Sequence, residues 1–190
     1  MSATLDTNLL FNYFSKDFSD SCGMLEIGGR LYPIEDTYLD DDVEDYVLES
    51  VVKAVEIHQK KEPGDILVFL TGQDEIDLAI NKLAQQLSND KNYIALPLHN
   101  RTPSEQCAKI FEESQKRKII FSTNVAETSI TIDGIKHVIE TGMVKGKTWD
   151  EKRKMQVLKT GLITQSSVKQ RRGRAGRTSS GIVSSFAVLF

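Results

Sequence analysis

The chain has 190 residues, of which 39% are hydrophobic, a length that allows one substantial buried core and part of a second. It contains no apolar run of about 18 residues and no basic start followed by an apolar core, so we expect neither a membrane span nor a secretory signal. We therefore expect an intracellular protein, and the sequence does not distinguish nucleus from cytoplasm. Two widely separated cysteines, Cys22 and Cys107, and three scattered histidines predict neither a disulfide framework nor a metal site.

Charge is distributed unevenly along the chain. Residues 1–142 carry 13 Lys and Arg against 25 Asp and Glu, whereas residues 143–190 carry 11 against 2, so the net charges are −12 and +9. This polarity indicates an anionic ligand on the basic part, either nucleic acid or the phosphates of a nucleotide. The alternative to a ligand site is a basic surface that is simply solvated. A charge run considered alone favours this alternative.

The first 40 residues differ in pattern from the rest. We expect a loop and a short helix within residues 1–14, and two short strands at residues 22–27 and 30–34. An acidic linker follows and leads into the first long helix, because carboxylates favour helix N-termini.

From residue 43 to residue 140, helical and strand-like segments alternate. Helical spacing of apolar residues predicts helices over 43–55 and 76–87. A third helix is predicted to run through Phe111, with Thr102, Pro103 and Glu105 forming a capping box at its start. Short apolar runs predict buried strands at residues 65–70, 92–99, 118–122 and 137–140. The fold class is therefore α/β, with a parallel sheet covered by helices on both faces and ligands beyond the carboxyl ends of the strands.

The last 48 residues add two features to this pattern. Two β-like runs within residues 143–163 flank the polar turn Asp150–Arg153, which predicts a hairpin projecting from the sheet. The apolar tail at residues 182–190 either completes a strand or exposes hydrophobic surface.

The segment Gln170–Arg177 places four arginines and two glycines in eight residues. If a helix begins here, Arg174 and Arg177 share one face and converge on one ligand. Guanidinium groups suit phosphate oxygens, and they can stabilise the charge that develops when a γ-phosphoryl group is transferred. A nonspecific basic patch or a localisation signal is the alternative.

A second polar cluster follows the strand predicted at residues 118–122. The stretch Ser122–Ile135 places Ser, Thr and Asn at the carboxyl end of that strand, where hydroxyls and free backbone N–H groups suit phosphate oxygens. Asp133 precedes Gly134 at an expected turn, where it either caps the turn or reaches a ribose hydroxyl.

These stretches resemble the motifs of a known family. Residues 123–135 (TNVAETSITIDGI) and Gln170–Arg177 are similar to the fifth and sixth motifs of the DEAH-box RNA helicases of superfamily 2. Ile66–Asp77 resembles the fourth motif region of that family, and Ser2–Thr4 matches its SAT motif. The resemblance implies a RecA-like sheet. It also implies that residues 1–39 are the end of a first RecA-like domain with its linker, and that residues 40–190 are a second RecA-like, helicase C-terminal domain, truncated or altered at its end.

The resemblance implies roles for individual residues at the nucleotide. Arg174 and Arg177 match the arginine fingers on the γ-phosphate, and Gln170 matches the residue that positions the attacking water or the phosphate. Asp133 matches a residue near the ribose. Phe111 resembles the aromatic residue that packs on the base, unless it is a core residue.

The resemblance also implies contacts with RNA. The stretch that contains Thr131 contacts both nucleotide and RNA in the family, and the hairpin separates or guides strands, with lysines suited to a phosphate track. The implied RNA-backbone contacts are Thr71, Gly72, Thr123, Asn124, Thr128 and Ser129.

Two family motifs are missing from the sequence. It contains neither a GxxxxGK[ST] phosphate loop nor a DEAH-like acidic motif. In the family these belong to the first RecA-like domain, which would hold most of the ATP, or another NTP, and its Mg²⁺. We therefore expect no significant ATP hydrolysis by the chain alone.

The expected function is part of an ATP-dependent RNA helicase that supplies arginine fingers and RNA-backbone contacts. The expected partners are RNA, bound with little sequence specificity, the first RecA-like domain and a protein activator. Two alternatives remain: a noncatalytic truncated module that binds RNA or a protein, and a fragment that is not stable on its own.

Overall fold

The computed structural model describes residues 7–18, 21–25, 32–38, 43–128 and 130–186, and it divides into two units, Met1–Leu31 and Tyr32–Phe190. The first unit contains helix α1 (Thr7–Ser15), in line with the short helix expected there. Residues 22–25 are not in a strand, so the strand expected at 22–27 is absent from its described part. The SAT motif, Ser2–Thr4, lies outside the described residues.

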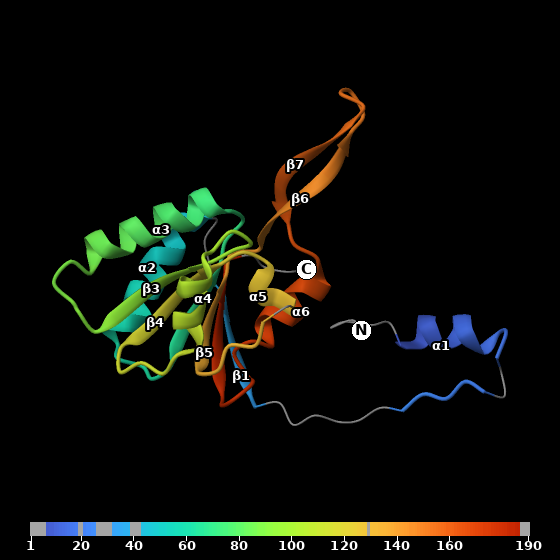
Figure 1. The fold of residues 1–190 in the computed structure, drawn as a ribbon, viewed down its shortest axis with the longest axis horizontal. Helices are drawn as coiled ribbons and strands as arrows, with labels where there is room; N and C mark the ends of the chain where they lie inside the picture. The colour runs from blue at the N-terminus through green and yellow to red at the C-terminus, as the bar shows by residue number, and fades with distance from the viewer. Residues whose placement is uncertain (1–6, 19–20, 26–31, 39–42, 129, 187–190) are drawn as a thin grey trace. The chain divides into compact units, whose positions relative to one another are not determined.

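The second unit is built on a six-stranded parallel sheet with the strand order β1-β8-β5-β2-β4-β3 (Figure 1). All four buried strands expected between residues 65 and 140 are present, within two residues of the expected bounds. The strands are β1 (Ile34–Tyr38), β2 (Asp65–Phe69), β3 (Tyr93–Leu98), β4 (Arg117–Ser122), β5 (Ile135–Glu140) and β8 (Gly181–Ser185).

Helices cover both faces of the sheet, which confirms the predicted α/β architecture. Helices α2 (Tyr46–Gln59) and α3 (Gln73–Gln86) pack on the face that receives Ile66 and Val68 of β2. The opposite face receives Leu67 and Phe69 and is covered by three shorter helices. These are α4 (Ser104–Phe111), α5 (Val125–Thr128) and α6 (Gln165–Arg172).

Strand β1 differs from the expectation. It begins at Ile34, where the second predicted strand was expected to end, and it pairs in parallel with β8 as the edge strand of the sheet. The expected domain boundary between residues 39 and 40 would separate β1 from this sheet, whereas the compact unit begins at Tyr32. The described part of the apolar tail completes β8, between β1 and β5.

The start of α4 corrects a second expectation. The Thr102 hydroxyl accepts the N–H of His99 at 2.8 Å, so it does not cap α4, and Pro103 is the N-cap residue. The capping box was therefore wrong, because Thr102 closes the preceding turn instead.

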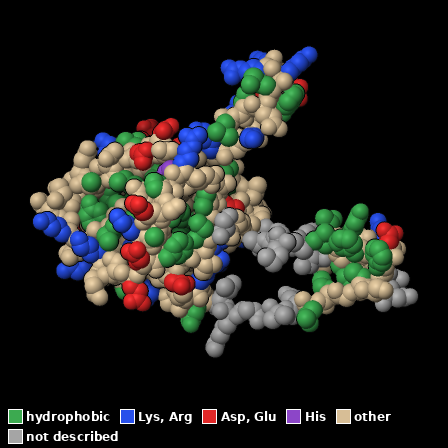
Figure 2. All heavy atoms as spheres, viewed as in Figure 1, with side chains coloured by type: hydrophobic (Ala, Val, Ile, Leu, Met, Phe, Trp, Pro, Cys, Tyr) green, Lys and Arg blue, Asp and Glu red, His purple; other side chains and the backbone are tan. Residues whose placement is uncertain are grey.

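The predicted hairpin is present as β6 (Met143–Asp150) and β7 (Met155–Leu162), which pair only with each other and project from the body of this unit (Figure 1). The Asp150 carboxylate accepts the N–H groups of Lys152 and Arg153 at 3.0 Å, which closes the turn. Figure 2 shows basic and hydrophobic side chains next to one another along the hairpin. No helix among the described residues is long and apolar enough to cross a membrane.

Candidate functional site

Four of the expected RNA-contacting residues meet at the carboxyl edge of the sheet. Thr71 and Gly72 follow β2, and Thr123 and Asn124 follow the neighbouring strand β4, so the parallel pairing brings them together. They line one open groove of about 390 Å³, here called the carboxyl-edge groove. Its remaining lining residues are Gln73, Asp74, His99, Asn100, Arg101, Lys145 and Leu158.

The start of α3 shapes one wall of the carboxyl-edge groove. Glu75, in the first turn of α3, accepts both the N–H and the hydroxyl of Thr71, at 2.9 and 2.6 Å. The Tyr46 hydroxyl also donates to Glu75, at 2.6 Å, and burial together with this bond raises the pKa of Tyr46 to about 12. Thr71 is thus held in place, and a Cβ added at Gly72 would reach only ordinary contact with the Lys145 side chain, whose Nζ lies 3.9 Å from that position.

The hairpin supplies another wall of the groove. Lys145 from β6 and Leu158 from β7 both line it. They belong to the same face of the hairpin, because cross-strand partners share a face and the register places Lys145 opposite Thr160 and Lys147 opposite Leu158. Thr128, exposed at the last residue of α5, does not line the groove, and Ser129 lies outside the described residues.

The arginine motif closes a helix and does not open one. Helix α6 ends at Arg172, and Arg174 and Ala175 continue in turns whose N–H groups donate to the carbonyls of Arg171 and Arg172. Gln170 lies within α6 and is half-buried. Each arginine of the motif has its own environment.

Arg171 is completely buried and bridges two acidic residues. Its Nε donates to Glu127 Oε2 at 2.9 Å and its Nη1 to Glu140 Oε1 at 3.0 Å. The guanidinium carbon also lies 4.7 Å from the centre of the Phe69 ring. Burial raises the pKa of Glu140, and the charge of Arg171 opposes this rise.

Arg174 also points into the protein, with 6% of its surface exposed. Its Nη1 donates to the carbonyl of Ile130 at 2.6 Å, and its Nη2 donates to the carbonyl of Glu127. Burial lowers the pKa of Arg174 to about 10, with the charge of Arg177 acting in the same direction, so the group remains a cation at neutral pH.

Arg177 and Arg172 lie nearer the surface. Arg177 is exposed, and its guanidinium donates to the hydroxyl of Thr131, which is separated from Asp133 only by the buried Ile132. Arg172 forms a two-pronged pair with Asp36 of β1, at 2.7 Å from Nε and 2.7 Å from Nη2.

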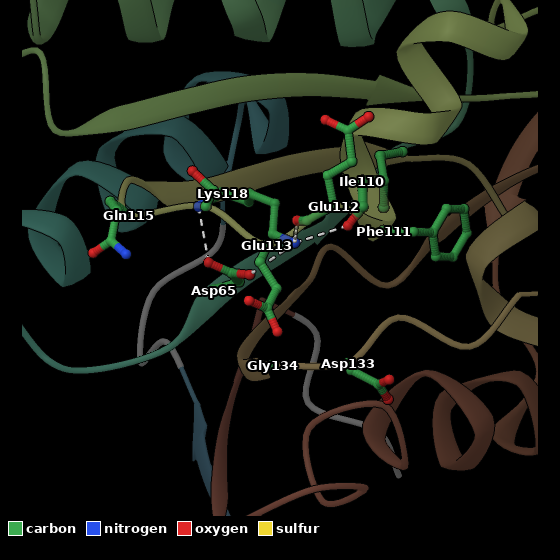
Figure 3. Close-up of a pocket in the computed structure, with 10 residues that line it drawn as sticks. Asp65, Ile110, Phe111, Glu112, Glu113, Gln115, Lys118, Asp133 and Gly134 are labelled. Carbon is green, nitrogen blue, oxygen red and sulfur yellow. Dashed lines mark hydrogen bonds and ion pairs between the residues drawn. The ribbon is translucent and has the colours of Figure 1, made fainter.

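Phe111 and Asp133 lie at the other edge of the sheet from the groove. They line a pocket of about 740 Å³ beside Asp65 at the amino end of β2 and Lys118 near the amino end of β4 (Figure 3). Phe111 is 54% exposed, so it is not a core residue. The four groove residues thus lie beyond the carboxyl ends of the strands, where ligands were expected, whereas Phe111 and Asp133 lie at the opposite edge.

Lys118 holds the wall of that pocket. Its Nζ donates to the carbonyls of Ile110 and Glu112, at 2.8 and 3.1 Å, and lies 3.6 Å from Asp65 Oδ2 (Figure 3). The two carbonyls flank Phe111 in sequence, so Lys118 fixes the end of α4 that carries the aromatic ring. Burial raises the pKa of Asp65, and the contacts with Lys118 oppose this rise.

The hairpin lysines were expected to suit phosphates, but the sequence did not place Lys145 in the groove, and it did not indicate the acidic partners of Arg171. A signal for Glu140 was present, since it is a charged residue that ends an otherwise apolar run, HVIE. Among the described residues there is no group of three or more His, Cys, Asp or Glu side chains that could hold a metal ion.

The chain matches a known protein family and several named proteins. The family described as helicase conserved C-terminal domain matches residues 47–179. The chain is 41% identical to the ATP-dependent RNA helicase DEAH12, chloroplastic, of Arabidopsis thaliana, over 95% of this chain and 10% of that protein. It is 41% identical to the pre-mRNA-splicing factor ATP-dependent RNA helicase prp22 of Schizosaccharomyces pombe, over 95% of this chain and 16% of that protein.

Among solved structures, the E. coli DExH-box NTPase HrpB is similar, with a TM-score of 0.85 and 29% sequence identity. That match covers 99% of this chain and 23% of HrpB. The chain thus spans between a tenth and about a quarter of the length of these known proteins. It belongs to the helicase conserved C-terminal domain family, and its relatives are DEAH-box ATP-dependent RNA helicases.

Proposed function

We propose that this chain acts as the second RecA-like half of an ATP-dependent RNA helicase, binding the RNA backbone in the carboxyl-edge groove. The observation that carries the proposal is the convergence of Thr71, Gly72, Thr123 and Asn124 on one groove beside Lys145. Hydroxyls, amides and backbone N–H groups beside a cation suit phosphate and sugar contacts, which carry little sequence information.

The nucleotide belongs to the pocket at the amino edge and to the arginine motif. Phe111 offers an exposed ring for a base, Asp133 offers a carboxylate for a ribose hydroxyl, and both line one pocket. ATP, when bound with Mg²⁺, supplies the phosphoryl-transfer chemistry, for which the partner is a first RecA-like domain.

The two proposed arginine fingers stand in different situations. Arg177 is exposed and donates a hydrogen bond to the Thr131 hydroxyl, so little has to be broken for its guanidinium to turn toward a phosphate. Arg174 must leave the carbonyls of Glu127 and Ile130 before it can do so. We therefore assign the direct phosphate contact to Arg177 first, and a protein activator would act by rearranging the segment that holds Arg174.

RNA binding by the chain itself tests the groove. The affinity for a fluorescently labelled single-stranded RNA is measured by anisotropy at several salt concentrations, for the parent chain and for Asn124→Ala. Asn89→Ala is the matched control, because Asn89 is an exposed asparagine that follows α3 and lies outside the groove. We expect a loss of about fivefold in affinity for Asn124→Ala, corresponding to about 1 kcal/mol.

Equal affinity of all three proteins would place RNA elsewhere on the chain, and no binding at any salt concentration would remove the RNA-binding proposal. The nucleotide half is tested separately, by ATP hydrolysis of this chain joined to a first RecA-like domain, with and without Arg177→Ala. Equal hydrolysis in both joined proteins would exclude Arg177 as a finger.

A further inference from the structure

The hairpin leaves and re-enters the fold at one point. Gly142, which has a φ of 75°, turns the chain out of β5, and its N–H donates to Glu140 Oε1 at 2.7 Å. The returning strand is fastened to the same residue, because the N–H of Ile163 donates to the carbonyl of Gly142 at 3.0 Å. Thr164 then begins α6 as its N-cap residue, so the hairpin is an excursion between β5 and α6.

Arg171 closes the base of this excursion. Its Nη1 donates both to Glu140 Oε1 and, at 3.3 Å, to the carbonyl of Met143, the first residue of β6. The same Glu140 oxygen receives the Gly142 N–H. One carboxylate oxygen therefore fixes the exit turn of the hairpin and the helix that follows its return.

The third partner of Arg171 leads to the carboxyl-edge groove. Glu127, bound to Arg171 Nε, lies in α5, which follows directly after the groove residues Thr123 and Asn124. The groove wall that precedes α5 and the hairpin wall that carries Lys145 are thus tied to one buried guanidinium. Stability alone is a poor explanation for these buried ion pairs. Arg171 Nη2 and Glu140 Oε2 are buried and have no hydrogen-bond partner among the described residues, and leaving such atoms unpaired is costly.

We propose that Arg171 is a positioning residue that sets the direction of the hairpin relative to the carboxyl-edge groove, through its shared contact with Glu140 and its contact with Glu127. The expected consequence is that both walls of the groove are held at the separation that single-stranded RNA needs. This consequence rests on the proposed function. Without Arg171, β6 and β7 still pair with each other, but the hairpin moves as a unit about Gly142 and Ile163.

The chain provides a matched control and a built-in probe. Arg172 is the next residue of α6 and also pairs with a carboxylate, but its partner is Asp36 of β1, remote in sequence from the hairpin. Trp149 is the only tryptophan in the chain and lies on the hairpin with 55% of its surface exposed. Its fluorescence therefore reports on the hairpin alone.

The test measures hairpin motion and RNA affinity in the same proteins. Backbone amide order parameters of β6 and β7, from ¹⁵N relaxation, are expected to fall from about 0.85 to below about 0.6 in Arg171→Met and to stay unchanged in Arg172→Met. Titration of single-stranded oligouridine, followed by Trp149 fluorescence, is expected to show a loss of about fivefold in affinity for Arg171→Met only.

Two further variants keep the test decisive if Arg171→Met fails to fold. Glu140→Gln retains an oxygen for the Gly142 N–H but loses the charge that holds Arg171, so we expect an intermediate loss of hairpin order. Arg171→Lys keeps the positive charge, so we expect it to retain part of the hairpin order that Arg171→Met loses. If the hairpin is equally ordered in the parent chain, in Glu140→Gln and in Arg171→Lys, the positioning role is overturned.

The two proposals fail in different ways. If the parent chain shows no Trp149 response and no affinity for the RNA, the proposed function fails, and the order parameters still decide whether Arg171 positions the hairpin. If the parent chain binds RNA and the Arg171 variants lose hairpin order with no change in affinity, the positioning role stands and its consequence for RNA is removed.

Discussion

Arg174 and Arg177 are three residues apart and were expected to act alike, yet the structure gives them different surroundings. Arg174 is buried against two backbone carbonyls, whereas Arg177 is exposed beside a hydroxyl. A spacing of three residues predicts one shared face only if a helix begins at this segment, whereas helix α6 ends at Arg172 and the motif continues in turns. The effect of substituting each arginine therefore depends on its burial and not on its position in the motif.

Stability measurements should separate these two arginines. Arg174→Ala leaves the buried carbonyl of Glu127 and the partly buried carbonyl of Ile130 without this donor, so we expect a loss of about 1–3 kcal/mol in the free energy of unfolding. Arg177→Ala should change it by no more than about 0.5 kcal/mol, because the residue is exposed. Urea denaturation measures both, and equal effects would contradict the different environments. Activity tests of Arg174 should therefore use Arg174→Lys, which retains the charge.

His137 predicts a pH dependence of stability. Burial lowers its pKa below the usual value of 6.5, and its Nε2 lies 3.2 Å from the carbonyl of Pro63. The unfolded chain then binds a proton at a higher pH than the folded chain, so this contribution to stability is complete above about pH 6.5 and is lost as pH falls below it. Urea midpoints between pH 5 and pH 8 should show this slope, and His137→Gln should flatten it. An unchanged slope in His137→Gln would assign the effect to other groups.

Helix α4 and strand β4 act together through Lys118, which binds the carbonyls on both sides of Phe111. Lys118→Met should cost about 2 kcal/mol, because it leaves these carbonyls and the half-buried Asp65 without their cation. It should also speed amide exchange at the end of α4. Lys116→Met is the control, since Lys116 is exposed in the preceding loop. If exchange at Phe111 is equal in both variants, Lys118 does not hold the aromatic ring in place.

The elements that the sequence predicted well are those with a local signal. Strand β2 (Asp65–Phe69) was expected because all but its first residue are apolar. A strand was instead expected at residues 30–34, because the sequence of β1, IEDTY, is mostly polar and carries no apolar run. The four groove residues proposed to contact RNA could be expected together, because they follow the adjacent parallel strands β2 and β4. The partners of Arg171 could not, since Glu127 and Glu140 lie 44 and 31 residues away in sequence and only the fold brings them together.

At the scale of the whole molecule, β1 joins a segment near the start of the chain to its last strand. The Arg172–Asp36 pair and the Thr37 hydroxyl, which donates to the carbonyl of Val183 at 3.1 Å, both fasten β1 to distant parts of the chain. Tyr32 also donates its N–H to the carbonyl of Gly176, at 3.1 Å. Residues 1–39 were expected to be the end of a first RecA-like domain with its linker. Because β1 pairs with β8, we now propose that only the residues before Tyr32 belong to that first domain.

Two truncations test this division of the chain. Removing residues 1–31 should leave the urea midpoint unchanged, because the described partners of β1 lie in the unit Tyr32–Phe190. Removing residues 1–39 also deletes β1, exposes the edge of β8 and leaves Arg172 without Asp36, so we expect a loss of several kcal/mol, at least about 3. Asp36→Asn in the full chain removes the ion pair with Arg172 but keeps β1. Because the pair is partly exposed, we expect a smaller loss of stability than from the removal of residues 1–39. If both truncations lose the same stability, residues before Tyr32 support this sheet; if neither does, β1 is dispensable.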